Sequence, residues 1–168
     1  MHVYSTGLNP RRMTSESVSM WLIHLINHTK ETQMLNTQSC AKWTPYVLGL
    51  LRIITGFLFL QHGTSKLLGM PHNPMFDGLQ LMSLMGFAGI LELVGGVLIL
   101  IGLFTRPVAF ILSGQMAVAY FMAHAPGGFL PITNGGELAT LYSFIFLYFA
   151  FAGAGKFSLD SVWCKKSV

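Results

Sequence analysis

The stretch that decides the fold is residues 87–102, FAGILELVGGVLILIG, in which a single carboxylate, Glu92, interrupts a run of apolar and small residues. Leu91, Leu93 and Val94 surround it, so a helix built from this run has no polar face on which to place a charge. In a bilayer, a charged side chain near the centre costs about 2.5 to 3.5 kcal/mol on insertion scales, so it normally faces the protein interior and has a partner. The fold therefore depends on whether this run lies in a membrane.

The composition favours a membrane protein. Of the 168 residues 52% are hydrophobic and only 10% are charged, whereas soluble domains carry about 25% charged residues. The ten Lys and Arg against six Asp and Glu give a net charge of +4, but these cations are not interleaved with aromatic residues as on a nucleic-acid surface. We expect the lipid bilayer, and no nucleic acid, as a partner.

Residues 1–44 are polar and mixed, and their apolar patch at 21–26 is too short to span a bilayer. We expect this extension to be disordered, or to be a gene-start artefact with Met34 in place of Met1 as the true start. The two cysteines, Cys40 and Cys164, lie outside the apolar spans without metal-type spacing, and we expect them to remain thiols.

Four apolar spans follow Pro45, each about long enough to cross 30 Å of hydrocarbon. The short loops between them contain Gly, Pro and Asn, and short loops make successive helices antiparallel. The predicted fold class is all-α, an integral-membrane, up-down-up-down bundle of four transmembrane helices. The spans are residues 46–68, 79–102, 106–123 and 136–154, within a domain of residues 45–163 that a short basic tail, 164–168, follows.

The distribution of cations predicts the orientation. Lys42, Arg106, Lys156 and the tail lysines fall on one side of the membrane, and Lys66 alone on the other. Because cytoplasmic loops are enriched in Lys and Arg, we expect both termini in the cytoplasm.

Two charges inside the predicted membrane suggest a structural ion pair, Arg52 with Glu92. Each lies on a stripe of glycines at helical spacing, which would let the two helices approach closely. The alternative is that the glycines are generic packing residues and that the charges pair with water or with backbone groups.

A second polar layer is predicted at the outer ends of the helices, where His62, Lys66, His124 and Glu137 are candidates for catalysis. A histidine at the membrane edge can carry a proton or bind a ligand, although it can also be a hydrogen-bonded anchor. Glu137 has an ordinary structural explanation, since an acid in a first helical turn is stabilised by the helix dipole. His62, His124 and Tyr148 are candidate contacts for a quinone or another small ligand, and the few unlinked ligands predict no metal site.

Several motifs in this order resemble the DoxX family of four-helix bacterial membrane proteins over roughly residues 45–163. They are Arg52, Gly56, His62, Gly63 and Lys66; Glu92, Gly95, Gly96, Gly102, Leu103, Thr105 and Arg106; the 116–124 segment; Asn134, Gly135, Gly136 and Glu137; and Gly153, Gly155, Lys156, Ser158, Leu159 and Asp160. The resemblance implies a multi-pass protein of the bacterial inner membrane. It also implies a link to oxidoreductase assemblies, including thiosulfate-to-quinone electron transfer and a detoxification complex with superoxide dismutase and a sulfurtransferase.

Three functions compete. The first is a subunit or anchor of a quinone-linked redox or thiol-stress system, with a soluble or peripheral oxidoreductase as partner and without a redox group of its own. The second is a small-solute or proton transporter. An intramembrane carboxylate supports this hypothesis. The presence of only four spans without an inverted repeat weakens it. The third is a non-catalytic assembly factor, and homo-oligomerisation is compatible with all three.

Overall fold

The computed structural model describes residues 15–163, apart from the side chains of 15, 17–18 and 31–39. These residues divide after Trp43 into two compact units, each described by itself. Residues 1–14 and the tail 164–168, with Cys164, lie outside the described part of the chain.

The first helix, α1 (Ser15–Leu68), begins well before the first predicted span. The expectation of a disordered extension is therefore wrong for residues 15–43, which are helical. No Gly or Pro occurs between Ser15 and Thr44, so nothing in the local sequence interrupts a helix there. The alternative start at Met34 remains a prediction.

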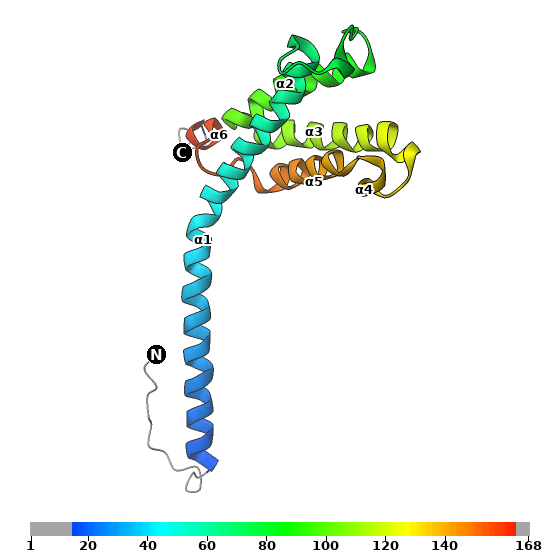
Figure 1. Cartoon of the computed structure of the whole chain (residues 1–168). Helices are drawn as coiled ribbons and strands as arrows, with labels where there is room; N and C mark the ends of the chain where they lie inside the picture. Colours follow the sequence, from blue (N-terminus) through cyan, green and yellow to red (C-terminus); the bar gives the residue numbers. More distant parts are fainter. Residues whose placement is uncertain (1–14, 164–168) are drawn as a thin grey trace. The chain divides into compact units, whose positions relative to one another are not determined.

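In the second unit, α1 packs against α2 (Leu84–Ile101), which returns antiparallel to it (Figure 1). The connection contains a short 3-10 helix, η2 (Pro74–Phe76), capped by Asn73. Ser83 caps the start of α2 by accepting a hydrogen bond from the Gly86 amide at 3.1 Å, and Gly102 ends the helix in a left-handed conformation with φ of 69°.

The predicted glycine stripes lie where the two backbones approach each other. A Cβ atom added to Gly56 would lie 2.6 Å from the Leu100 nitrogen, and one added to Gly96 would lie 2.8 Å from the Leu60 Cα. Gly63 likewise has no room for a side chain against Leu93. Glycine is needed here for close helix packing rather than for backbone flexibility.

The remaining elements follow as α3 (Thr105–Ala119), a π-helical turn η3 (Tyr120–His124), η4 (Ala125–Gly127), α4 (Pro131–Asn134), α5 (Glu137–Ala152) and α6 (Leu159–Trp163). The helices α3 and α5 lie side by side and antiparallel (Figure 1). Ser113 and Ser143 join them reciprocally, because each hydroxyl donates to the other residue's carbonyl oxygen, at 2.8 and 3.1 Å.

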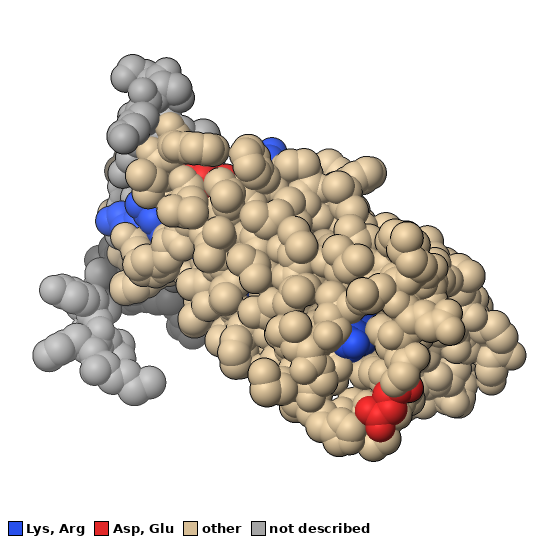
Figure 2. All heavy atoms as spheres, turned by 90° about the horizontal axis from the view of Figure 1, so that it is seen from above, with Lys and Arg blue, Asp and Glu red and all other residues tan. Residues whose placement is uncertain are grey.

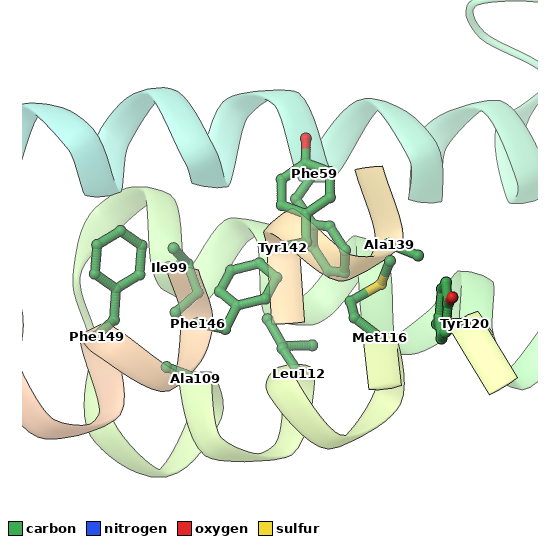
Figure 3. Close-up of a cluster of buried hydrophobic side chains, with 10 residues drawn as sticks. All are labelled: Phe59, Ile99, Ala109, Leu112, Met116, Tyr120, Ala139, Tyr142, Phe146 and Phe149. Atoms are coloured by element: carbon green, nitrogen blue, oxygen red, sulfur yellow. The ribbon is translucent and has the colours of Figure 1, made fainter. Parts of the chain in front are cut away.

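The core lies between α1, α2, α3 and α5, and half of its buried residues are aromatic (Figure 3). The Phe146 ring is fully buried, with its centroid 4.8 Å from that of Phe59 and 5.7 Å from that of Tyr142. The ten buried apolar residues are Phe59, Ile99, Ala109, Leu112, Met116, Tyr120, Ala139, Tyr142, Phe146 and Phe149.

The outer surface of these helices is apolar as well. Large side chains such as Phe110, Phe144 and Phe151 are more than half exposed, and the face shown in Figure 2 carries only isolated charged residues. Three helical segments are long and apolar enough to cross a membrane, Cys40–Leu68, Leu84–Ile101 and Thr105–Gly127. An apolar surface of this extent is expected on a protein whose helices face lipid.

The prediction of four spanning helices is therefore met in part. The described residues are helical without strands, and three of the four predicted spans correspond to helices of spanning length. The fourth, α5, is apolar but has 16 residues, which is about 24 Å of helix.

Candidate functional site

The Glu92 carboxylate forms an ion pair with Lys66 instead of the predicted pair with Arg52. The Lys66 Nζ donates to both carboxylate oxygens, at 2.6 and 2.7 Å. The side chains are only 10% and 7% exposed, so the pair is shielded from water. The prediction that Glu92 faces inward with a cationic partner is confirmed, and the assignment of Arg52 as that partner is wrong.

The packing of α1 against α2 explains the correction. Gly63 lies against Leu93 in this antiparallel pair, which places Glu92 level with residue 64, two residues from Lys66. Arg52 precedes that level by three turns of helix, about 18 Å along the axis. The sequence does not fix this alignment, because either cation is compatible with a glycine stripe.

Arg52 is fully buried and binds backbone carbonyl groups. Its Nη1 donates to Ile99 at 2.5 Å and to Leu100 at 2.6 Å, in the last turn of α2. Its Nε and Nη2 donate to Ala154 and Phe157, both at 2.8 Å, in the segment after α5. The guanidinium thus binds the carbonyl end of α2, where the helix dipole favours a cation, and joins three parts of the fold.

A cavity of about 630 Å³ opens near the end of α1 where Lys66 lies. The rings of His62 and Tyr142 meet edge to face at its wall, with centroids 6.1 Å apart. Three helical segments and the loop after α1 contribute its lining, which consists of Leu58, Gln61, His62, Ser65, Pro71, His72, Asn73, Pro74, Phe76, Leu138 and Tyr142.

The ion pair lies directly behind this cavity. Lys66 lies one turn after His62 on α1, and its Nζ is 5.5 Å from the centroid of the Phe76 ring, which lines the cavity. Glu92 is close enough to Tyr142 for the two groups to interact electrostatically. The wall thus presents an imidazole and a phenol, with a buried carboxylate and ammonium in support.

His124 belongs to a different cluster. It lies in the π-helical turn, where its Nδ1 is 3.1 Å from the Asn134 carbonyl oxygen and its ring stacks on Tyr120. Asn134 also bonds the Gly128 carbonyl and accepts a hydrogen bond from the Gly136 amide. These contacts give His124 and Asn134 a structural role in connecting η3 to α5.

Glu137 and Tyr148 are both exposed on α5. Glu137 lies in the first turn of the helix, as predicted, and its carboxylate makes no hydrogen bond or ion pair with any described residue. The predicted outer layer therefore divides into the cavity residues His62 and Lys66, the His124 cluster, and two exposed side chains. Within residues 15–163, no three His, Cys, Asp or Glu side chains gather closely enough to hold a metal ion.

The prediction missed Tyr142, the tyrosine that does line the cavity. Its signal is the spacing of Ala139, Tyr142, Phe146 and Phe149, which places all four on one buried face of α5. It also missed Gln115, the amide in the apolar α3. The Gln115 Nε2 donates to the Ala88 carbonyl at 3.2 Å, and its buried Oε1 has no partner among the described residues.

The comparisons with known proteins agree with the predicted resemblance. The family model described as DoxX matches residues 47–125. An uncharacterised protein of Haemophilus influenzae is 48% identical over 134 residues, which cover 74% of this chain and 96% of that protein. The chain belongs to the DoxX family.

Two further relatives bear on this DoxX chain. The Bacillus subtilis protein named "Putative oxidoreductase CatD" is 33% identical over 113 residues, covering 66% of this chain and 82% of CatD. An uncharacterised membrane protein of Mycobacterium tuberculosis is 29% identical over 142 residues, covering 70% of this chain and 81% of that protein. No solved structure matches the chain. The family and the apolar helices together make this chain a membrane protein.

Proposed function

We propose that this DoxX protein is the membrane subunit of a quinone-linked redox system, and that the cavity beside His62 binds the quinone ring. The observation that carries the proposal is the meeting of His62 and Tyr142 at one wall of that cavity. The name of the CatD relative, which describes an oxidoreductase, is consistent with a redox role.

The cavity fits a flat ring with two carbonyl groups. Its volume of about 630 Å³ lies within the range of small-molecule sites, which are mostly apolar with a few placed polar groups. Leu58, Leu138 and Phe76 supply apolar walls. An imidazole N–H and a phenol O–H are the donors that a quinone carbonyl oxygen requires.

Reduction of a quinone consumes two electrons and two protons, and this chain would supply only the site and a proton path. The electrons would come from a soluble or peripheral oxidoreductase that docks on the membrane subunit. His62 is suited to pass protons because an imidazole has two ring nitrogens, one of which can accept a proton while the other releases one. The Lys66–Glu92 ion pair would keep the net charge beside the quinone site at zero and would hold α1 against α2.

The membrane setting is part of the proposal. We place the protein in the bacterial inner membrane with four antiparallel helices, α5 being the fourth, and with both termini in the cytoplasm. Arg106 and Lys156 lie at the predicted cytoplasmic end, whereas Lys66 at the other end is neutralised by Glu92. This asymmetry supports the orientation.

A scaffold without chemistry is the second candidate. The observation in its favour is that both intramembrane charges, Arg52 and Glu92, are fully engaged in holding the fold together. A scaffold does not need His62 or Tyr142 at a cavity wall, so ligand binding separates the two candidates.

The test is purification of the full chain in mild detergent, followed by mass spectrometry of extracted quinones and of co-eluting proteins. We expect a stoichiometric quinone in the wild-type protein and a loss in a variant with Leu138→Trp, which fills the cavity. A well-folded wild-type sample with neither quinone nor oxidoreductase would contradict the proposal.

A further inference from the structure

A second cavity, of about 440 Å³, lies at the opposite end of the 44–163 helices, beside the start of α3. The first turn of α3, the segment after α5 and helix α6 surround it. Its polar lining includes Thr105, Arg106 and Ser161, and its apolar lining includes Pro107 and Trp163. The proposed function uses none of these residues.

Arg106 is a cation without a protein partner in this cavity. It is exposed, and its guanidinium makes no hydrogen bond or ion pair with the residues that the structure describes. Its guanidinium lies beside Gly153, where an added Cβ would be 3.4 Å from Nε and 3.5 Å from Nη2. The guanidinium therefore lies in van der Waals reach of Gly153 along the cavity wall.

The acidic residue in the cavity does not compete for Arg106. Each Asp160 carboxylate oxygen accepts a backbone hydrogen bond at the start of α3, from Phe104 at 2.8 Å and from Thr105 at 2.9 Å. These amides are the unpaired donors of a helix N-terminus, and they already stabilise the negative charge of Asp160. Arg106 is left to attract an external anion.

Thr105 is a second group that lacks a partner. The residue is fully buried, and its Oγ1 has no hydrogen-bond partner in the described part of the chain. A buried hydroxyl without a partner is costly, and nearly all such groups in native proteins are satisfied. An oxygen of a ligand in the cavity that Thr105 lines would satisfy it.

The surroundings favour a lipid as the source of that oxygen. Phe104 and Trp163 are 53% and 60% exposed, and their rings meet edge to face with centroids 5.9 Å apart. Exposed aromatic rings at the end of apolar helices are typical of the level of lipid headgroups. Basic pockets between membrane helices are known sites for acidic headgroups.

We propose that this cavity binds the phosphate of an acidic phospholipid, with the Arg106 guanidinium donating to the phosphate oxygens and Thr105 Oγ1 donating to one of them. The Asp160 carboxylate holds the start of α3 in place for this contact. The site is separate from the His62 cavity, and neither proposal depends on the other.

The experiment is thermal unfolding of the full chain in neutral detergent while phosphatidylglycerol, phosphatidylcholine of the same acyl chains, or inorganic phosphate is added. We expect half-maximal stabilisation at about a tenfold lower concentration of phosphatidylglycerol than of phosphatidylcholine, as for one charge-assisted hydrogen bond. Arg106→Gln should abolish this preference. Lys156→Gln is the matched control, because Lys156 does not line the cavity and lies 5.7 Å from the Tyr46 ring.

Thr105→Val provides a second, isosteric variant. We expect it to unfold at or above the wild-type temperature in phosphatidylcholine, since it removes a buried hydroxyl that has no partner, and to need about twofold to tenfold more phosphatidylglycerol for half-maximal stabilisation. Equal weakening by Arg106→Gln and Lys156→Gln, or equal stabilisation by inorganic phosphate and phosphatidylglycerol, would overturn the proposal.

Discussion

Single residues show two different ways of keeping a charge among apolar helices. The Lys66–Glu92 pair cancels a negative charge with a positive one, at 2.6 Å. Arg52 instead donates its hydrogen bonds to four backbone carbonyl oxygens. Removal of Lys66 or Glu92 leaves the other member of the pair as a buried, uncompensated charge. Removal of Arg52 leaves backbone carbonyl groups without their donor.

Removal of one member of the ion pair should destabilise the protein more than removal of both. We expect Lys66→Met or Glu92→Leu alone to lower the free energy of unfolding by about 3 to 5 kcal/mol, since each leaves an uncompensated buried charge. The double variant should regain most of that loss. Chemical unfolding in detergent measures all three, and a double variant as unstable as the sum of the singles would contradict the pairing.

Arg52 should not be replaceable by lysine. A lysine keeps the charge but lacks the planar guanidinium that reaches carbonyl groups at the end of α2 and in the segment after α5 at the same time. We expect Arg52→Lys to lower the free energy of unfolding by about 2 to 4 kcal/mol, as two or more strong hydrogen bonds are lost. Lys156→Arg, at an exposed lysine outside both cavities, is the control and should change the free energy of unfolding by less than about 0.5 kcal/mol. Equal effects of the two substitutions would contradict the role of Arg52.

The site could be predicted from the sequence only in part, and the reason is the packing register. The cost of burial predicts that Glu92 needs a partner, and helical spacing predicts that His62 and Lys66 share a face. The choice of Lys66 over Arg52 depends on which glycine of α1 meets which residue of α2, which local sequence does not encode. The spacing along α5 places Tyr142 on one face with Phe146 and Phe149, but apolar residues occupy the other faces as well, so the sequence does not show which face is buried.

At the scale of elements, the glycines of α2 determine how closely it approaches α1. A methyl group at Gly96 would lie 2.8 Å from the Leu60 Cα and 2.9 Å from the Leu60 nitrogen, and backbone atoms cannot move aside cheaply. Gly114 on α3, in contrast, has no neighbour within 4 Å of an added Cβ. The two positions therefore make a matched pair for substitution.

We expect Gly96→Ala to lower the free energy of unfolding by about 1 to 3 kcal/mol, because α1 and α2 must separate. Gly114→Ala should raise it by about 0.5 to 1 kcal/mol, because alanine favours a helix and meets nothing. Thermal unfolding in the same detergent compares them. A loss at Gly114 as large as that at Gly96 would mean that the close approach is not the cause.

The elements themselves were more predictable than their contacts. Apolar runs bounded by Gly, Pro and Asn predict α2, α3 and α5 to within a few residues, because helix-breaking residues and the length of an apolar run are local properties of the sequence. The helical continuation of α1 back to Ser15 and the π-helical turn at Tyr120–His124 were not predicted. The helix before residue 44 has no apolar pattern that would indicate it. The π-helical turn differs from an α-helix by one residue in its hydrogen bonding, which amino-acid composition does not reveal.

For the whole molecule, the excess of cations at one end predicts the orientation. A green fluorescent protein fused after residue 168 should fluoresce, since we place the C-terminus in the cytoplasm, and alkaline phosphatase fused after Gly128 should be active on the other side. Assays of both fusions in intact cells measure this. An inactive phosphatase with a dark fluorescent fusion would reverse the proposed orientation.

The central proposal for the whole molecule is that the His62 cavity binds a quinone through Tyr142. Isothermal titration of a short-tailed quinone into the purified chain tests it, with Tyr142→Phe compared with Tyr148→Phe, an exposed tyrosine on the same helix. We expect Tyr142→Phe to weaken binding about twofold to tenfold, as for one hydrogen bond, and Tyr148→Phe to bind like the wild type. Absence of saturable binding to the folded wild-type protein, or equal weakening by both substitutions, would contradict it.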